Sequence, residues 1–130
     1  VALPASHPLV NASSLTLEQL ADYPYIYFDQ GKDAPAAVFE EAWGDQPRAK
    51  SIATTDRASL SELIVALNGY TVTSGILVGI SDGAQLRTVA LDADVTLRLG
   101  YLKKKGAQLD GTAARFVATL EKNLERYAKF

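Results

Sequence analysis

The sequence predicts an α/β fold, a three-layer sandwich with a mixed sheet of about four to five strands. Stretches with helical periodicity alternate along the chain with short β-rich stretches, an order typical of helices packed on a sheet. Connections between parallel strands are right-handed crossovers, which leaves few topologies open. The length of 130 residues and the 48% share of hydrophobic residues suffice for one domain with a buried core.

The first part of the chain predicts two strands and two helices. Val1–Leu3 has the composition of the end of a strand, and the prolines of Pro4–Pro8 predict an extended connection. Thr16–Gln19 matches a capping box, so a short helix should begin directly after Thr16. A strand over Tyr25–Phe28 and an amphipathic helix over Ala34–Trp43 are expected next.

The central segment Lys50–Ile76 predicts a strand, a helix and a second strand in one uninterrupted unit. Thr55 or Asp56 can act as the helix N-cap, Asn68-Gly69 supplies a stop signal, and Tyr70–Ser74 is β-rich again. One helix face is expected to be buried through its residues at helical spacing, Leu60, Leu63, Ile64 and Leu67. In such units a ligand usually lies beyond the carboxyl ends of the strands, where N–H groups of the first helical turn favour anions.

Three further elements are expected after this unit. Leu86–Leu91 predicts a strand, and Val95–Lys103 predicts a longer one that faces the core on one side only. The final helix, Thr112–Tyr127, has a hydrophobic stripe that consists of Ala113, Phe116, Val117, Leu120, Leu124 and Tyr127. We expect this stripe to pack on another lobe or a neighbouring molecule, and hence a dimer or higher association.

The composition excludes several classes of function. The net charge of −2, with Lys103-Lys104-Lys105 as the one basic run, argues against nucleic-acid binding by this segment itself. The absence of cysteine excludes disulfides and thiolate metal sites, and it fits a reducing, cytoplasmic location. The apolar runs are too short to span a bilayer. Because the chain starts in strand-like sequence with neither Met nor a signal peptide, we expect it to be a fragment of a longer protein.

Several motifs occur in an order that resembles one family. They are His7-Pro8-Leu9, Leu15-Thr-Leu-Glu-Gln-Leu-Ala-Asp-Tyr-Pro-Tyr-Ile26, Asn68-Gly-Tyr-Thr-Val-Thr-Ser-Gly75, the strand Leu97–Lys103 and Thr112-Ala-Ala-Arg-Phe-Val117. Over nearly the whole chain this order resembles the effector-binding region of bacterial LysR-type transcriptional regulators. In one place the chain departs from the pattern: many members have a proline after the Gly-Ile pair, whereas this chain continues Ile76-Leu-Val-Gly79.

The resemblance implies a specific architecture and a specific activity. In that family an N-terminal winged helix-turn-helix binds DNA, and two α/β lobes joined by crossover strands bind a small effector between them. Residues 1–106 would be the second lobe, one lobe of a type-2 periplasmic-binding-protein-like fold, with both crossovers, Val1–Pro8 and Leu99–Gly106. Residues 107–130 would hold a terminal helix of the first lobe. The protein would bind DNA only through the missing N-terminal domain, would not associate with membranes, and would need no cofactor.

Candidate effector-binding residues lie where the predicted strands end. Thr54, Thr55, Asp56 and Ser59 surround the predicted helix N-terminus, where they can bind an effector carboxylate or simply cap the helix. Asp56 carries the same charge as an anion, which favours capping for that residue. Thr73 and Ser74 close one strand, and Asp29 and Gln30 follow another, so their side chains can reach the same cleft. Tyr25 and Tyr27 are expected to be structural.

Other functions find less support. His7 is the only histidine, which argues against a histidine metal site, and we expect it to be a hinge or surface residue. No phosphate-binding loop, metal-ligand spacing or pairing of a base with a nucleophile occurs, so we expect no enzyme and no bound metal. The alternatives are a lobe of a transport-type solute-binding protein and, less well supported, a small enzyme that would depend on Asp29 or Asp56.

Overall fold

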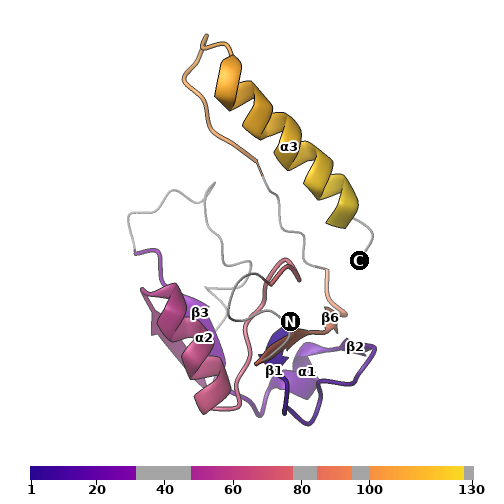
Figure 1. The fold of residues 1–130 in the computed structure, drawn as a ribbon. Helices are drawn as coiled ribbons and strands as arrows, with labels where there is room; N and C mark the ends of the chain where they lie inside the picture. Colours follow the sequence, from indigo (N-terminus) through magenta and orange to yellow (C-terminus); the bar gives the residue numbers. More distant parts are fainter. Residues whose placement is uncertain (32–47, 78–84, 95–99, 128–130) are drawn as a thin grey trace. The chain divides into compact units, whose positions relative to one another are not determined.

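The computed structural model describes residues 1–31, 48–77, 85–94 and 100–127 (Figure 1). In chain order the elements are β1 (Ala2–Pro4), β2 (Ser14–Leu15), α1 (Leu17–Leu20), β3 (Tyr25–Phe28), β4 (Ser51–Thr54), α2 (Arg57–Ala66), β5 (Leu86–Thr88), β6 (Ala90–Leu91) and α3 (Gly111–Tyr127). The chain divides into two compact units, Val1–Leu97 and Arg98–Phe130, and α3 is the helix of the second. The helix predicted over Ala34–Trp43 lies outside the described residues.

The strands of the first unit form both parallel and antiparallel pairs. β3 pairs with β4 in parallel, β2 pairs with β6 in parallel, and β1 pairs with β5 antiparallel. Two isolated bridges, from Tyr70 to Tyr25 and from Thr71 to Ala2, place the Tyr70–Thr71 segment between β3 and β1. The spatial order is therefore β4, β3, Tyr70–Thr71, β1 and β5.

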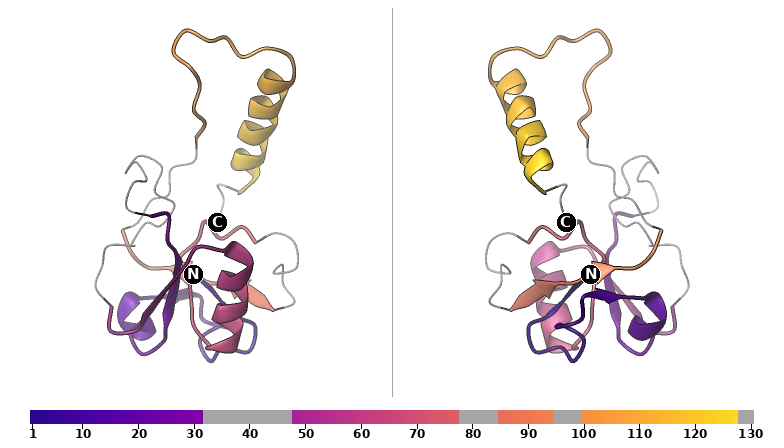
Figure 2. Two further views of the ribbon diagram at one scale, coloured as in Figure 1. Left: turned by 90° about the vertical axis from the view of Figure 1, so that its left-hand side faces the viewer. Right: turned by 90° about the vertical axis from the view of Figure 1, so that its right-hand side faces the viewer.

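The alternating side chains of β3 belong to two hydrophobic clusters on its two faces. Tyr25 lies in the cluster that also contains Val1, Leu3, Leu15, Leu20, Tyr70 and Val89. Ile26 lies in the other cluster, with Leu60, Ile64 and Leu86. Since Leu20 comes from α1 and Leu60 from α2, each face is covered by a different helix, and the two helices lie on opposite sides of the strands (Figure 2).

The capping box predicted for α1 is confirmed. The side-chain oxygen of Thr16 accepts a hydrogen bond from the backbone N–H of Gln19, and the Gln19 side chain accepts one from the backbone N–H of Thr16 over 2.8 Å. These two bonds satisfy donors at the helix start that have no partner within the helix. The cap fixes α1 so that Leu20 is fully buried.

Asp56, one of the two predicted caps, is the N-cap of helix α2, and the helix ends at the predicted stop signal. Leu60 and Ile64 are buried, whereas Leu67 is 42% exposed because it is the C-cap residue and has left the buried face. Asn68 takes the left-handed conformation, with φ of 49°, that ends many helices. At Gly69 a Cβ atom would lie 2.6 Å from the carbonyl oxygen of Pro24, so only glycine fits this approach to the chain before β3.

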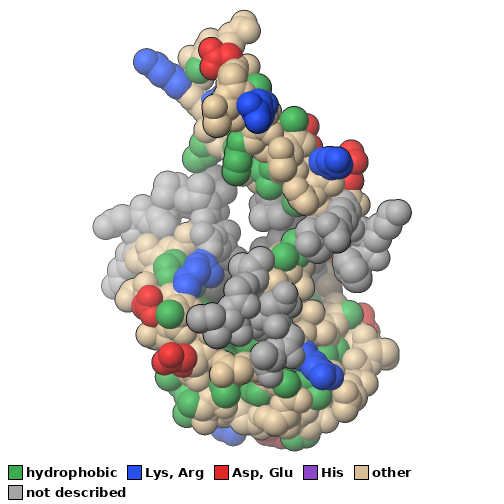
Figure 3. Space-filling model, in the orientation of Figure 1, with side chains coloured by type: hydrophobic (Ala, Val, Ile, Leu, Met, Phe, Trp, Pro, Cys, Tyr) green, Lys and Arg blue, Asp and Glu red, His purple; other side chains and the backbone are tan. Residues whose placement is uncertain are grey.

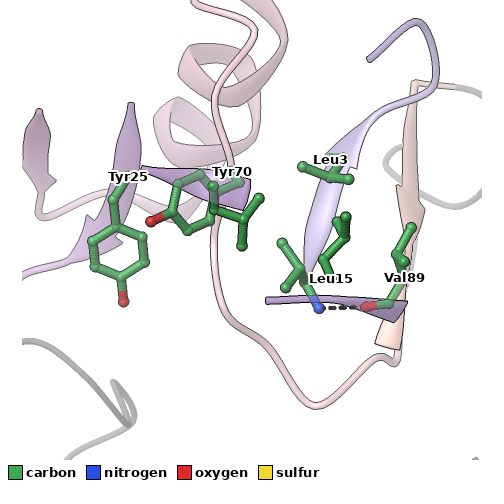
Figure 4. Packing of buried hydrophobic residues seen from close by; sticks show 7 residues of the cluster. Leu3, Leu15, Tyr25, Tyr70 and Val89 are labelled. Atoms are coloured by element: carbon green, nitrogen blue, oxygen red, sulfur yellow. Dashed lines mark hydrogen bonds between the residues drawn. The ribbon is translucent and has the colours of Figure 1, made fainter. Parts of the chain in front are cut away.

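Two predictions from the β-rich segments were wrong in extent. The predicted strand Tyr70–Ser74 contains two bridge residues only, Tyr70 and Thr71. The predicted strand Leu86–Leu91 is split at Val89, because β5 pairs with β1 while β6 turns to β2. At the split, the backbones of Val1 and Val89 exchange two hydrogen bonds, one of which is drawn in Figure 4.

The predicted extended connection Pro4–Pro8 is a series of turns instead. The N–H of His7 donates to the carbonyl oxygen of Pro4 over 2.9 Å, and that of Val10 donates to His7 over 3.1 Å. Prolines tolerate turns as readily as extended chain, so the sequence did not distinguish the two. The chain therefore reverses direction directly after β1.

The second unit contains α3, predicted at nearly the same bounds. Hydrophobic side chains are visible along one side of this helix, with Lys and Arg elsewhere on it (Figure 3). Val117, Leu120 and Leu124 are half-buried, while Phe116 is 65% exposed. The predicted strand Val95–Lys103 is not formed over Gly100–Lys103, because none of the described strands pairs with this stretch. Its other residues, 95–99, lie outside the described part of the chain.

Candidate functional site

The carboxyl ends of β3 and β4 lie side by side and form the base of the candidate site. Phe28 pairs with Thr54 in the parallel register, and the backbone N–H of Asp29 donates to the carbonyl oxygen of Thr54 over 2.8 Å. The residues that follow two parallel strands leave the sheet at the same edge, so Asp29 and Thr55 emerge together. Helix α2 begins two residues later, at this edge.

Hydrogen bonds order the turn from β4 into α2. The Thr54 hydroxyl oxygen accepts a bond from the N–H of Asp56 over 3.2 Å, and Asp56 Oδ2 accepts one from the N–H of Ser59 over 2.6 Å. Asp56 has the extended backbone conformation of an N-cap, with φ of −125° and ψ of 128°. Four predicted site residues, Asp29, Thr54, Asp56 and Ser59, are thus joined by direct hydrogen bonds.

The carboxylate of Asp56 changes the electrostatics that the sequence predicts for this helix start. Hydrogen bonds from Ser59, above all from its backbone N–H, hold the pKa of Asp56 below its ordinary value. The ionised carboxylate therefore neutralises part of the positive end of the helix dipole. The first turn of α2 already has an anion of its own, so an effector anion would need a further positive group.

Arg57 provides such a group, and the sequence analysis missed it. Its guanidinium carbon lies 4.3 Å from the centroid of the Phe28 ring, a cation–π distance. Phe28 is the last residue of β3 and Arg57 is the first of α2, so the contact joins two ends that meet at the site. A cation in the first helical turn was visible in the sequence, but its aromatic partner is 29 positions away and becomes evident only from the pairing of β3 with β4.

The residues after β3 form a tight turn. Asp29 Oδ1 accepts a hydrogen bond from the backbone N–H of Gly31 over 2.8 Å, which is the geometry of an Asx-turn. The Asp29 side chain is exposed and that of Gln30 is half-buried. Asp29 is therefore held at the edge by a local bond.

Three other predicted site residues are not tied into this group. Thr55 is exposed between Thr54 and Asp56, Thr73 is half-buried, and Ser74 is exposed. The hydrogen bonds that link the described residues of the site do not include Thr73 or Ser74. The structure thus brings together the Thr54–Ser59 turn and Asp29, and it leaves Thr73-Ser74 as a separate segment.

An aromatic cluster that the sequence analysis did not recognise lies at the opposite end of β3. The rings of Tyr25 and Tyr70 approach to 5.3 Å (Figure 4). Those of Tyr25 and Tyr27 stack at 5.6 Å. The guanidinium carbon of Arg48 lies 3.7 Å from the centroid of the Tyr25 ring. Burial raises the pKa of the Tyr70 hydroxyl, and the positive charge of Arg48 opposes that rise. This arrangement stabilises the core and contributes no group to the site.

His7 is not the hinge or surface residue that the sequence predicts, because its side chain is only 2% exposed. Its Nδ1 accepts a hydrogen bond from the backbone N–H of Leu9 over 3.1 Å, and its ring packs against Tyr23 at 4.3 Å. Burial lowers the pKa of His7 below its ordinary value.

Two general features bear on the chemistry of the site. Among the residues that the structure describes, no three side chains of the metal-ligating types come together. In the same part of the chain, every helix is too short or too polar to cross a membrane.

The comparison with known proteins identifies one family. The family model for the LysR substrate binding domain matches residues 1–125, which is nearly the whole chain. No curated protein matches the chain in sequence.

Proposed function

The chain belongs to the family of LysR substrate-binding domains, which are the effector-binding parts of LysR-type transcriptional regulators, and we propose that it couples small-molecule binding to DNA binding by a separate helix-turn-helix domain. The family match over residues 1–125 is the observation that carries this proposal. The family also implies an α/β fold of the periplasmic-binding-protein type, and the two-faced packing of β3 agrees with it.

We propose that residues 1–106 form the second lobe with its two crossover segments, and that residues 107–130 supply a helix to the first lobe. The strand order β4, β3, Tyr70–Thr71, β1, β5 supports a mixed sheet of about four to five strands in the intact lobe. Helices on both faces of β3 support the three-layer sandwich. The exposed Phe116 on α3 supports a helix whose apolar side packs on a further part of the protein.

The effector would lie at the carboxyl ends of the strands, in a cleft closed by the other lobe. We propose contacts from Asp29, Gln30, Thr54, Thr55, Asp56, Ser59, Thr73 and Ser74, and we add Arg57. The parallel bridge between Tyr25 and Tyr70 supports the inclusion of Thr73, because it sets the start of the segment that leads to Thr73 beside β3. Thr54 is paired with Phe28 at the end of β3.

Signalling would occur by a shift between two arrangements of the lobes. An effector that binds one arrangement more tightly than the other moves the equilibrium by its difference in affinity, whereas equal binding to both has no effect. The DNA-binding dimer would then be repositioned. The net charge of −2 supports a division of labour in which this part of the protein does not contact DNA. We also propose that the protein is cytoplasmic and that it self-associates.

The proposal is tested by titrating the intact regulator with representative carboxylates, amino acids, sugars and aromatic acids while promoter binding is followed by fluorescence anisotropy. At least one class is expected to change the affinity for DNA. The variant Thr73→Val, which removes one hydroxyl at constant shape, should weaken that response by up to about tenfold. Thr119→Val is the matched control, because the Thr119 hydroxyl bonds only within α3, to the carbonyl oxygen of Arg115. No response to any class would contradict the proposal.

The coding sequence upstream of the Val1 codon distinguishes a regulator from a transport-type solute-binding protein. A regulator requires a helix-turn-helix there, with a recognition helix that carries basic residues. A secretion signal in its place would overturn the regulatory function.

A further inference from the structure

The buried His7 has an arrangement of hydrogen bonds that the proposed function does not use. His7 lies in the turns between β1 and β2, with the backbone N–H of Leu9 donating to its Nδ1. Its Nε2 is also buried, and in the described part of the structure it has no hydrogen-bond partner. His7 is the only histidine of the chain.

These contacts specify one protonation state. A nitrogen that accepts a hydrogen bond has no proton, so Nδ1 is the unprotonated nitrogen and the imidazole is neutral, with its proton on Nε2. Protonation of Nδ1 would place two hydrogens against each other, that of the imidazolium and that of the Leu9 amide. It would also leave a buried positive charge, which is costly without a paired acceptor.

The surroundings offer no compensation for that charge. Tyr23, from the segment between α1 and β3, packs against the His7 ring, and a neutral tyrosine cannot balance an imidazolium. Within the described residues, the histidine ring is in contact with no carboxylate that could form an ion pair. The lowered pKa of His7 has the same origin, namely burial.

We propose that His7 is a pH-sensitive latch: the neutral imidazole closes the turn after β1, and the imidazolium opens it. The turn is tied to the chain before β5 through the bond from the N–H of Ala5 to the carbonyl oxygen of Gln85, 2.8 Å long. An open latch therefore releases the end of β1 where it leaves β5. If Val1–Pro8 is a crossover segment, as in the proposed function, acidification makes this connection between the lobes more flexible. The latch itself needs no effector.

Hydrogen exchange of the chain between about pH 7.5 and pH 5 tests the latch, with rates expressed as protection factors to remove the intrinsic pH dependence. The amides of Ala5, Leu9 and Val10 are expected to lose protection by up to about tenfold per pH unit once the pH passes below the ordinary histidine range. Those of Ile26 and Leu60, on β3 and α2, should remain unchanged.

His7→Asn is the matched variant, because the Asn side-chain oxygen can accept the Leu9 N–H as in an Asx-turn but does not titrate. Its protection factors should be independent of pH over this range. NMR titration of the single imidazole in the unsubstituted chain provides a second measurement, and its midpoint should lie below the ordinary histidine range, at the pH where the loss of protection is complete. Equal pH dependence in both proteins, uniform loss across all amides, or an imidazole that titrates at an ordinary value with protection intact would each overturn the latch.

Discussion

The guanidinium carbon of Arg57 lies 4.3 Å from the centre of the Phe28 ring and joins the start of α2 to the end of β3. An exposed cation–π contact is worth about 0.5–1 kcal/mol. Arg57→Ala should therefore lower the free energy of unfolding by no more than about 1 kcal/mol. A double-mutant cycle with Phe28→Leu, followed by urea denaturation, should give a coupling of the same size.

Arg115→Ala on α3 serves as the control for loss of one exposed positive charge, and it should couple to Phe28→Leu by less than about 0.3 kcal/mol. If both arginines couple equally to Phe28, the contact is not specific. In the intact regulator, Arg57→Ala should in addition weaken the response to an anionic effector, whereas Arg115→Ala should not.

The cap at Asp56 predicts a pH dependence of stability. Its pKa is lowered in the folded protein by hydrogen bonds from Ser59, so the unfolded state binds the proton more readily. The stabilisation is therefore present above the ordinary aspartate pKa and is lost as the pH falls below it. Asp56→Ala should lower the urea midpoint at neutral pH, and the two proteins should converge in acid.

Asp56→Asn separates the cap from the charge, because an amide oxygen can still accept the Ser59 N–H. This variant should retain most of the neutral-pH stability and lose the acid-dependent part. A midpoint equal to that of Asp56→Ala at every pH would show that the charge alone is responsible.

The close approach at Gly69 predicts a large effect of one methyl group. In Gly69→Ala the new Cβ would lie 2.6 Å from the Pro24 carbonyl oxygen and closer still to Cδ1 of Ile26. Forcing an atom into a packed interior costs about 1–3 kcal/mol. Thermal unfolding should show the loss, and Gly100→Ala, where no atom lies within 4 Å of a new Cβ, is the control.

Two residues of the same predicted helix face should differ strongly in their contribution to stability. Ile64 is fully buried, whereas Leu67 is 42% exposed. Ile64→Ala should cost about 2–5 kcal/mol, as cavity-forming substitutions do. Leu67→Ala should cost less than about 1.5 kcal/mol, because folding removes less apolar surface from water at this position. Similar urea midpoints for the two variants would contradict the described position of α2.

The Arg48–Tyr25–Tyr70 cluster predicts a shift in a tyrosine titration. The positive charge of Arg48 opposes the rise that burial causes in the pKa of Tyr70. Arg48→Gln should therefore raise the pKa of Tyr70 further, as measured by NMR of labelled tyrosine rings. An unchanged or lower pKa would show that Arg48 does not act on this hydroxyl. Arg87→Gln, an exposed site on β5, is the control.

Features that depend on neighbouring residues were predictable from the sequence. The capping box of Thr16 and Gln19 lies within four residues, and so does the cap from Asp56 to Ser59. The stop at Asn68-Gly69 was equally visible, because a left-handed residue ends many helices. In each case the partners are fixed by helix geometry alone.

Features that depend on distant partners were not predictable in the same way. The split of the predicted strand at Val89 arises because β5 pairs with β1 and β6 with β2, which no local pattern specifies. The burial of His7 depends on Tyr23, and the position of Arg57 depends on Phe28. At the site, the sequence indicated which strand ends carry polar groups. The position of the Arg57 cation between these ends, however, follows only from the pairing of β3 with β4.

The place of β1 has a consequence for how the chain folds during synthesis. β1 comprises Ala2–Pro4, yet it pairs with Thr71 and with β5, and Val1 bonds to Val89, 88 positions away. The ribosome therefore releases β1 long before its partners exist, and its apolar side chains stay exposed through that interval. Such distant pairing slows folding and favours intermediates that aggregate. Closure of this sheet is thus a late event, which cannot occur until residue 89 has emerged.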